Sequence, residues 1–523
     1  MRVTARSETR LGRRIAGGLT LLPYLLVALG PVAWLLTSLS AGVPDQLLGA
    51  RPLTLLGRSF GLALGASALA TGIGFGAALW MASGHGPLRR AARATYLAPL
   101  LLPSHAAALT WVVLLGQRSP LRQVLEALTG TSVSPYGLGA AVLVLALTLF
   151  PVVVLFALAR LDTLESALVE SGRLFAADGR VWWKGVLPMA LPSALTGGAL
   201  VFCLALVDFG VPAMLQVPVY AMEIQAEFAQ SGDPGRSTWT ALPLLLLGVG
   251  FLLAALASAR QTPVVGHPAT RGSLHRLAVP KGLKVWMGIA MAFAVLSVGG
   301  PVAVLVIQAG SPAPVLEAIR ASHAELGLSL AVALAAGLLA ALIALPVARR
   351  VAPPGNRSLL VLCLLPLAIP APLIGIALVH LGAVPGLASL ADTGAWLVLA
   401  HVCRLLPIAL IALALDHRRI DPLLRDAAAV HAPSPLRRVL WVDLPLAGPG
   451  MVVAVAAVLV FSLGELGTTV LVAPPGYGTF SVKLFNLLHY GASEVAAGMV
   501  LCLVLLVVAT WGVVLTLRSR VRR

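Results

Sequence analysis

The sequence predicts an all-α polytopic membrane protein with about twelve transmembrane helices in two parallel six-helix repeats. Composition gives the first reason: 59% of the 523 residues are hydrophobic and only 11% are charged. Soluble proteins are about 25% charged, so this chain could not cover a water-exposed surface of its size. The other two reasons are a series of long apolar segments and the recurrence of marker residues at fixed offsets.

Twelve apolar segments reach the roughly 20 residues that a transmembrane helix needs. Proline and glycine inside them are compatible with spanning helices, because neighbouring helices can satisfy the freed backbone groups. The first segment is too long for the apolar region of a cleavable signal peptide, so we expect it to be retained. The expected limits are 15–38, 59–83, 94–117, 137–159, 193–217, 237–259, 285–308, 326–348, 358–383, 395–415, 448–472 and 496–517.

Basic residues predict the orientation of these spans. With the N-terminus inside, 29 of the 37 Lys and Arg residues fall in cytoplasmic segments and seven in loops on the other side. Cytoplasmic loops carry such an excess in membrane proteins, so both termini are expected in the cytoplasm. The net charge of +17 is then a topology signal, and no nucleic acid partner is expected. The lipid bilayer is the expected surroundings.

Marker residues of the first half recur in the second half. Two prolines of the third span return 267 residues later, and an acidic residue and a Leu-Pro pair return after 257. The chain is therefore expected to form a first lobe (1–259), a cytoplasmic linker (260–284) and a second lobe (285–523). Parallel repeats of this kind build a pathway at their interface. The matched positions are Pro99 and Pro366, Pro103 and Pro370, Pro151 and Pro407, Leu187-Pro188 and Leu444-Pro445, and Asp208 and Glu465.

The loop after the tenth span carries the most specific motif. Its spacing resembles the pattern E-A-A-x3-G-x9-I-x-L-P, the EAA loop of permeases from binding-protein-dependent ABC importers, with Asp for Glu and Ala for Gly. The residues that match are Asp426, Ala427, Ala428, Ala432, Leu444 and Pro445. A weaker copy follows the fourth span, without the paired alanines and one residue shorter. It consists of Glu170, Ala176, Leu187 and Pro188.

Nearly the whole chain, and best its last 100 residues, resembles the fused two-lobe permeases of iron(III) and thiamine importers. This resemblance implies the type I ABC importer permease fold and a multi-pass protein of the bacterial inner membrane. It implies a channel-forming subunit that receives a small solute from a periplasmic binding protein. Two copies of an ABC ATPase would dock on the two loops. Iron(III) is the expected solute, with thiamine, phosphonate or polyamine as alternatives.

The chain is not expected to be an enzyme or to bind a cofactor. It has no GxxxxGK[ST] phosphate-binding loop, so ATP would be hydrolysed by the partner subunits. Its histidines, including His105, His380 and His401, show no metal-ligand spacing, and no metal site is expected. An ion-coupled secondary transporter is a more distant alternative, although it would have no need for paired docking loops.

Two acidic residues are expected deep inside the fifth and eleventh spans. An ionisable group at such depth is costly and therefore suggests a function, but a hydrogen-bond acceptor that pins two helices together would look the same. We assign to a pathway or gate Asp208, Phe209, Gly210, Glu465, Leu466 and Gly467. Arg404 in the tenth span could pair with such an acid or extend toward the cytoplasmic interface.

Overall fold

The computed structural model describes residues 10–39, 49–116, 119–164, 166–258, 273–352, 356–417, 439–489 and 494–521, and the single positions 420, 423, 424, 427 and 437. All regular elements in this part of the chain are helical, which confirms the all-α class. The first half contains α1 (Arg10–Leu36), α2 (Ala50–Ala82), α3 (Pro87–Thr95), α4 (Ser104–Leu114), α5 (Pro120–Thr129), α6 (Leu138–Leu161), α7 (Ser166–Phe175), α8 (Asp178–Val181), α9 (Leu187–Leu206), α10 (Gly210–Met214), α11 (Tyr220–Ser231) and α12 (Pro234–Ser258).

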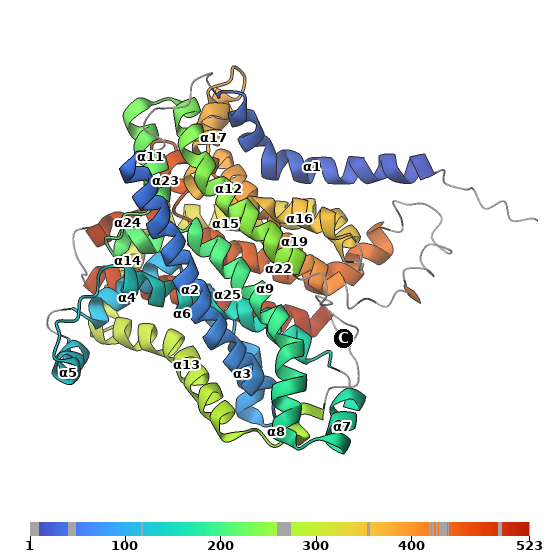
Figure 1. Cartoon of the computed structure of the whole chain (residues 1–523). Coiled ribbons are helices and arrows are strands. Elements are labelled where there is room, and N and C mark those ends of the chain that lie inside the picture. The colour runs from blue at the N-terminus through green and yellow to red at the C-terminus, as the bar shows by residue number, and fades with distance from the viewer. Residues whose placement is uncertain are drawn as a thin grey trace, which may run out of the picture.

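The second half largely repeats this order, with the short helix α14 before α15 as a difference among the described elements (Figure 1). It contains α13 (Lys281–Ala309), α14 (Ala313–Ala321), α15 (His323–Val351), α16 (Arg357–Leu364), α17 (Ala371–Gly382), α18 (Ala388–Ala391), α19 (Gly394–His417), α22 (Leu444–Leu463), α23 (Thr469–Val472), α24 (Phe480–His489) and α25 (Glu494–Val521). Even the irregular turns recur: π-helical segments cover Trp182–Val186 and Val439–Asp443, and 3-10 turns cover Ala98–Leu101 and Leu365–Ala368.

Nine helices in the described part of the chain are long and apolar enough to cross a membrane. Two further candidates are bent pairs: 87–100 with 104–114 meet at 94°, and 358–368 with 371–382 meet at 87°. Both bends fall at the repeated prolines, where the missing N–H and the fixed φ interrupt a helix. With the bent pairs the count is eleven, and α1 contributes a shorter apolar stretch, Thr20–Leu36. A count of twelve spans stays a prediction.

The first helix of each half packs on the other half. α1 lies against α15, α17 and α19, and the Tyr24 hydroxyl donates to the Cys363 carbonyl at 2.8 Å. In the same way α13 packs along α2, where the side chains of Trp286 and Ala290 lie over Gly76. The two halves are therefore interlocked, since separating them would expose both of these apolar contacts.

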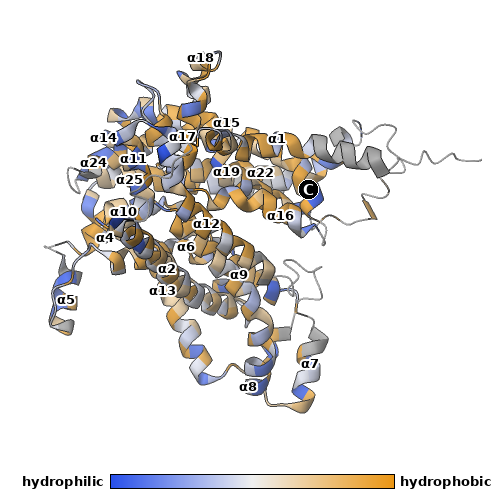
Figure 2. Ribbon diagram, turned by 45° about the horizontal axis from the view of Figure 1, so that its top comes forward, coloured by the Kyte–Doolittle hydropathy of each residue, from blue (hydrophilic) through white to orange (hydrophobic). Residues whose placement is uncertain are grey.

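Hydrophobic residues make up most of the long helices, while hydrophilic residues gather on short helices and connections such as α8 (Figure 2). Inside, small residues bring helices close together. At Gly74 on α2 a Cβ would lie 2.7 Å from the Phe150 carbonyl oxygen on α6. The four cysteines are free and buried, in agreement with their apolar surroundings in the sequence.

Two expected helix limits are wrong. The spans expected at 193–217 and 448–472 begin earlier and end at Leu206 and Leu463. Asp208 and Glu465 therefore lie in breaks just beyond the helices rather than inside them. The reason is local: each carboxylate accepts the backbone N–H three residues later, from Val211 at 2.9 Å and from Thr468 at 3.1 Å. Such local side-chain bonds compete with helix continuation.

Candidate functional site

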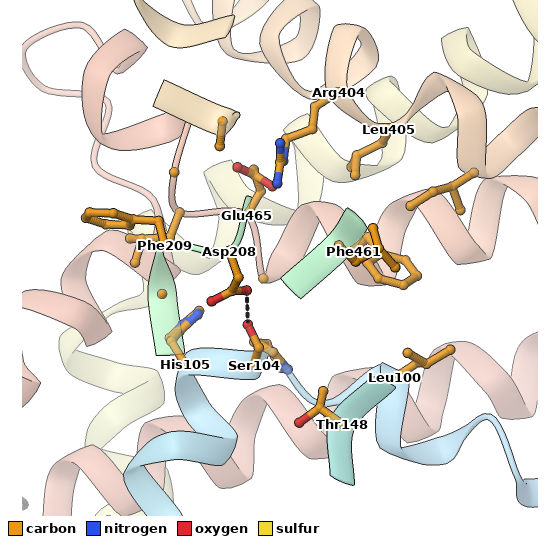
Figure 3. A pocket seen from close by; sticks show the side chains of 18 of the residues that line it. Leu100, Ser104, His105, Thr148, Asp208, Phe209, Arg404, Leu405, Phe461 and Glu465 are labelled. Carbon is orange, nitrogen blue, oxygen red and sulfur yellow. Dashed lines mark hydrogen bonds and ion pairs between the residues drawn. The ribbon is translucent and has the colours of Figure 1, made fainter. Parts of the chain in front are cut away.

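A cavity of about 160 Å³ lies where the breaks of the two halves meet (Figure 3). Pro103 and Pro366 of the bent pairs line it, together with residues of the segments that follow α9 and α22. All six residues that the sequence assigns to a pathway line this cavity, although their role stays a prediction. The polar lining residues are Ser104, His105, Thr148, Asp208, Arg404 and Glu465.

In the first half, Asp208 is held by neutral groups. Its Oδ1 accepts the Val211 N–H at 2.9 Å, and its Oδ2 accepts the Ser104 hydroxyl at 3.3 Å (Figure 3). Ser104 is presented there because α4 begins directly after the Pro103 bend. No Lys or Arg among the described residues forms an ion pair with Asp208.

In the second half, Glu465 is held by a cation. Arg404 reaches from α19 and donates from Nε to Glu465 Oε2 at 2.8 Å. The other carboxylate oxygen, Oε1, accepts the N–H and the hydroxyl of Thr468, each at 3.1 Å. The pairing of Arg404 with an acid, one of its two sequence interpretations, is therefore the one found.

The two buried histidines near the cavity differ in their surroundings. His401 contacts the hydroxyls of Ser462 and Thr469 through its two ring nitrogens, so it joins α19 to α22 and α23. His105 is 1% exposed and lines the cavity, and its Nε2 makes no hydrogen bond within the described structure. The described residues contain no cluster of three or more His, Cys, Asp or Glu side chains suited to a metal ion.

The first EAA-like loop is a folded helical unit at the far end of the molecule from α11 and α17 (Figure 1). α7 and α8 form a hairpin whose turn contains Ala176, and α9 begins at Leu187 with Pro188 in its first turn. Leu174 and Phe175 at the tip of α7 are 81% and 87% exposed. Unpaired apolar side chains of this size at one tip indicate a contact surface.

Residues 273–280 pack onto this loop; we call them the strap. Leu274 and Leu277 of the strap are buried in the same core as Val169 and Val181 of the loop. Arg276 pairs with the predicted loop residue Glu170 at 3.0 Å, and the Ala278 N–H donates to Asp178 at 2.7 Å. From the sequence, this stretch is expected only as part of the linker, because two leucines spaced by three residues do not by themselves predict packing onto another segment.

The second EAA-like loop is described only in part. Asp426, Ala428 and Ala432 lie outside the described residues, and Ala427 is exposed. Leu444 and Pro445 begin α22, as Leu187 and Pro188 begin α9. Asp443, just before α22, forms an ion pair with Arg349 at the end of α15.

Comparison with known proteins gives consistent matches. Residues 53–264 match the family described as binding-protein-dependent transport system inner membrane component. The putative 2-aminoethylphosphonate transport system permease protein PhnV of Salmonella paratyphi A is 36% identical over 114 residues, 22% of this chain and 42% of that protein. The molybdenum transport system permease protein ModB of Mycobacterium tuberculosis is 29% identical over 204 residues, 37% of this chain and 73% of that protein.

The chain thus spans less than half the length of the PhnV relatives it matches. The family match covers most of the first half, and it includes the loop from α7 to α9 and the break at Asp208. The first half of the chain is thus similar to the binding-protein-dependent transport system inner membrane components.

Proposed function

We propose that this chain is the channel-forming subunit of an ABC importer. The observation that carries the proposal is the meeting of the two breaks, one from each half, at a single polar cavity inside an otherwise apolar helical body. A solute pathway along the interface of two parallel repeats has this form. Asp208 and Glu465, with their flanking residues Phe209, Gly210, Leu466 and Gly467, would form the central constriction.

ATP hydrolysis would come from two copies of an ABC ATPase. The tip of the first loop offers Leu174 and Phe175 as an apolar contact, and the second loop would offer the matching site around Asp426 to Pro445. A periplasmic binding protein would deliver the solute at the opposite end. Both chain termini would lie in the cytoplasm of a bacterium, and this chain would need no cofactor of its own.

Iron(III) is the first solute to test, with thiamine, phosphonate and polyamine as alternatives. The relatives add two named candidates, because PhnV is named for 2-aminoethylphosphonate and ModB for molybdenum. An ion-coupled carrier remains the contrasting mechanism, since the cavity contains buried carboxylates that could bind an ion.

Reconstitution tests the mechanism directly. The tagged chain is purified from its native membranes, the proteins that co-purify are identified, and the complex is placed in liposomes with the binding protein. Solute uptake should require ATP in the compartment that faces the loops and should be unaffected by collapsing ion gradients. Uptake that needs a proton or sodium gradient and no ATP would replace the importer proposal with the ion-coupled carrier.

A further inference from the structure

The two halves place different charges at equivalent positions of the cavity. Asp208 and Glu465 correspond at an offset of 257, and Thr148 and Arg404 correspond at 256. All four residues line the cavity. The second half therefore carries an acid with its own cation, while the first half carries an acid opposite a neutral threonine.

Thr148 does not compensate for the missing cation. Its hydroxyl proton is donated to the Val144 carbonyl at 2.8 Å on its own helix, so this proton is not available to Asp208. Asp208 keeps one hydroxyl and one backbone N–H as donors. With a neutral imidazole at His105, two carboxylates and one guanidinium leave the cavity a formal charge of −1. A buried charge without a partner is expensive, so the cavity favours an added cation.

His105 is a second, independent sign of a ligand site. Its ring points toward Asp208 (Figure 3), and its Cβ packs where a Cβ at Gly210 would lie, 3.2 Å away. Nε2 is buried without a hydrogen-bond partner within the described structure. Buried polar atoms are normally satisfied. A neutral imidazole protonated at Nδ1 offers its Nε2 lone pair to a metal ion or to an N–H donor.

We propose that the Asp208 carboxylate and the His105 Nε2 bind the positively charged part of the transported solute, either a metal ion or a protonated amine. This inference rests on the proposed importer function and specifies its cargo. The cavity holds an ion with several waters or a small amine group. Two protein donors give a weak site, as a pathway requires, because a cargo must also leave. A bare oxyanion such as molybdate would be repelled by Asp208.

Equilibrium dialysis of the full chain in lipid nanodiscs tests this with three labelled probes: Co²⁺, ethanolamine and molybdate. We expect saturable binding of one cation per chain and none of molybdate. Asp208→Asn should weaken cation binding at least tenfold, and Asp208→Glu should retain it. Asp392→Asn, in the exposed turn after α18, is the matched control and should bind as the unmodified chain does.

The variant His105→Ala distinguishes a metal ion from a protonated amine as the cargo. If the cargo is a metal ion, this change weakens Co²⁺ binding tenfold or more, because it removes a nitrogen ligand. If the cargo is an amine, ethanolamine binds in place of Co²⁺ and the loss is only a few-fold. Thr148→Arg, which copies the second half, should abolish binding of either cation by neutralising Asp208.

Saturable molybdate binding, binding of neither cation, or full cation binding by Asp208→Asn would each overturn the inference. The first two results come from the unmodified chain and so do not depend on whether a variant folds. ATP-driven uptake of a solute without a positive group would also overturn the inference while supporting the importer function. A chain that binds a cation but shows no ATP-dependent uptake would instead contradict the importer proposal.

Discussion

Arg404 and Glu465 are joined by a charge-assisted hydrogen bond of 2.8 Å across the break between α22 and α23, with side chains 21% and 9% exposed. The pair connects α19 to the segment that follows α22, so it fixes the second-half wall of the cavity. The chain tolerates this buried carboxylate because Oε2 bonds Arg404 while Oε1 accepts the N–H and the hydroxyl of Thr468.

Breaking this pair from one side should be costly. Arg404→Leu leaves Glu465 buried and uncompensated, and losses of about 3–5 kcal/mol are typical of such changes. We expect a clearly lower melting temperature for the purified variant in nanodiscs. The double variant Arg404→Leu with Glu465→Leu should recover most of the loss, because neither charge is then stranded. If the double variant is no more stable than Arg404→Leu, the pair is not the source of the effect.

Helix contact in the first half should depend on one glycine of α2. At Gly74 a Cβ would lie 2.7 Å from both the Phe150 carbonyl oxygen and the Val153 Cβ, so Gly74→Ala forces α2 and α6 apart. Overpacking of this kind costs about 1–3 kcal/mol. Gly72→Ala is the control on the same helix, since nothing lies within 4 Å of its Cβ. A melting temperature for Gly74→Ala equal to that of Gly72→Ala would contradict the close packing.

The sequence predicts the architecture well and its interruptions poorly. Apolar length is visible in any single sequence, so the long helices could be anticipated. The bends could not, because 94–117 and 358–383 look like continuous spans, whereas the helix pairs there meet at 94° and 87°. The ends of α9 and α22 could not, since Asp208 and Glu465 stop those helices by bonding N–H groups three residues on. Apolar residues continue on both sides of each break, so the hydropathy of the sequence does not show where these helices end.

The same limit applies to the site. The repeat offset identified Asp208 and Glu465 as a pair, and all six assigned pathway residues line one cavity. From the sequence, His105 is expected to be a satisfied or pore-lining histidine because the chain has no metal-ligand spacing. Its unpartnered Nε2 is visible only in the folded chain. The strap residues Leu274 and Leu277 were missed for a related reason: their burial depends on α7 and α8, about 100 residues earlier.

The loop after α5 should loosen in acid. Glu126 accepts bonds from the Arg122 side chain at 2.8 Å and from the Val133 N–H at 3.0 Å, and the Arg122 hydrogen bond followed by the Val133 bond lowers the pKa of Glu126 below its usual 4.5. Because the folded pKa is lowered, this support is complete above about pH 4.5 and is lost as pH falls further. The protection of the Val133 amide, measured as its exchange rate relative to the intrinsic rate at the same pH, should therefore fall below that pH.

Glu126→Gln provides the control for this loop. The variant lacks the titrating group, so exchange at Val133 should be faster at neutral pH and nearly independent of acidification beyond the intrinsic rate. Identical pH profiles for the variant and the unmodified chain would show that Glu126 does not hold the loop.

The strap should rigidify the first docking loop. Leu277→Ser replaces a side chain that is 4% exposed beside α7 and α8, and losing this burial costs about 2–3 kcal/mol of local packing. We expect faster hydrogen exchange in 169–181 with little change in α15, which lies in the other half. Ala278→Gly is a mild companion change, because its backbone N–H still donates to Asp178. If hydrogen exchange in 169–181 is unchanged in Leu277→Ser, the strap contacts the loop but does not stabilise it.

The docking surface itself is tested at the tip of α7. Phe175→Asp places a charge where an 87% exposed ring would contact the proposed ATPase, and anchors of this type commonly contribute 2 kcal/mol or more to an interface. Co-purified ATPase should fall by roughly tenfold or more, while membrane insertion and the melting temperature of the chain stay unchanged. Val124→Asp on α5, at the opposite end and also exposed, is the matched control and should recover ATPase normally.

In the second loop, where the EAA-like spacing is closest, Ala432→Trp should likewise reduce the amount of co-purified ATPase, because it adds bulk at the small position. Normal ATPase recovery in both Phe175→Asp and Ala432→Trp, together with normal uptake, would remove the loops from the coupling mechanism and leave them as connections between spans.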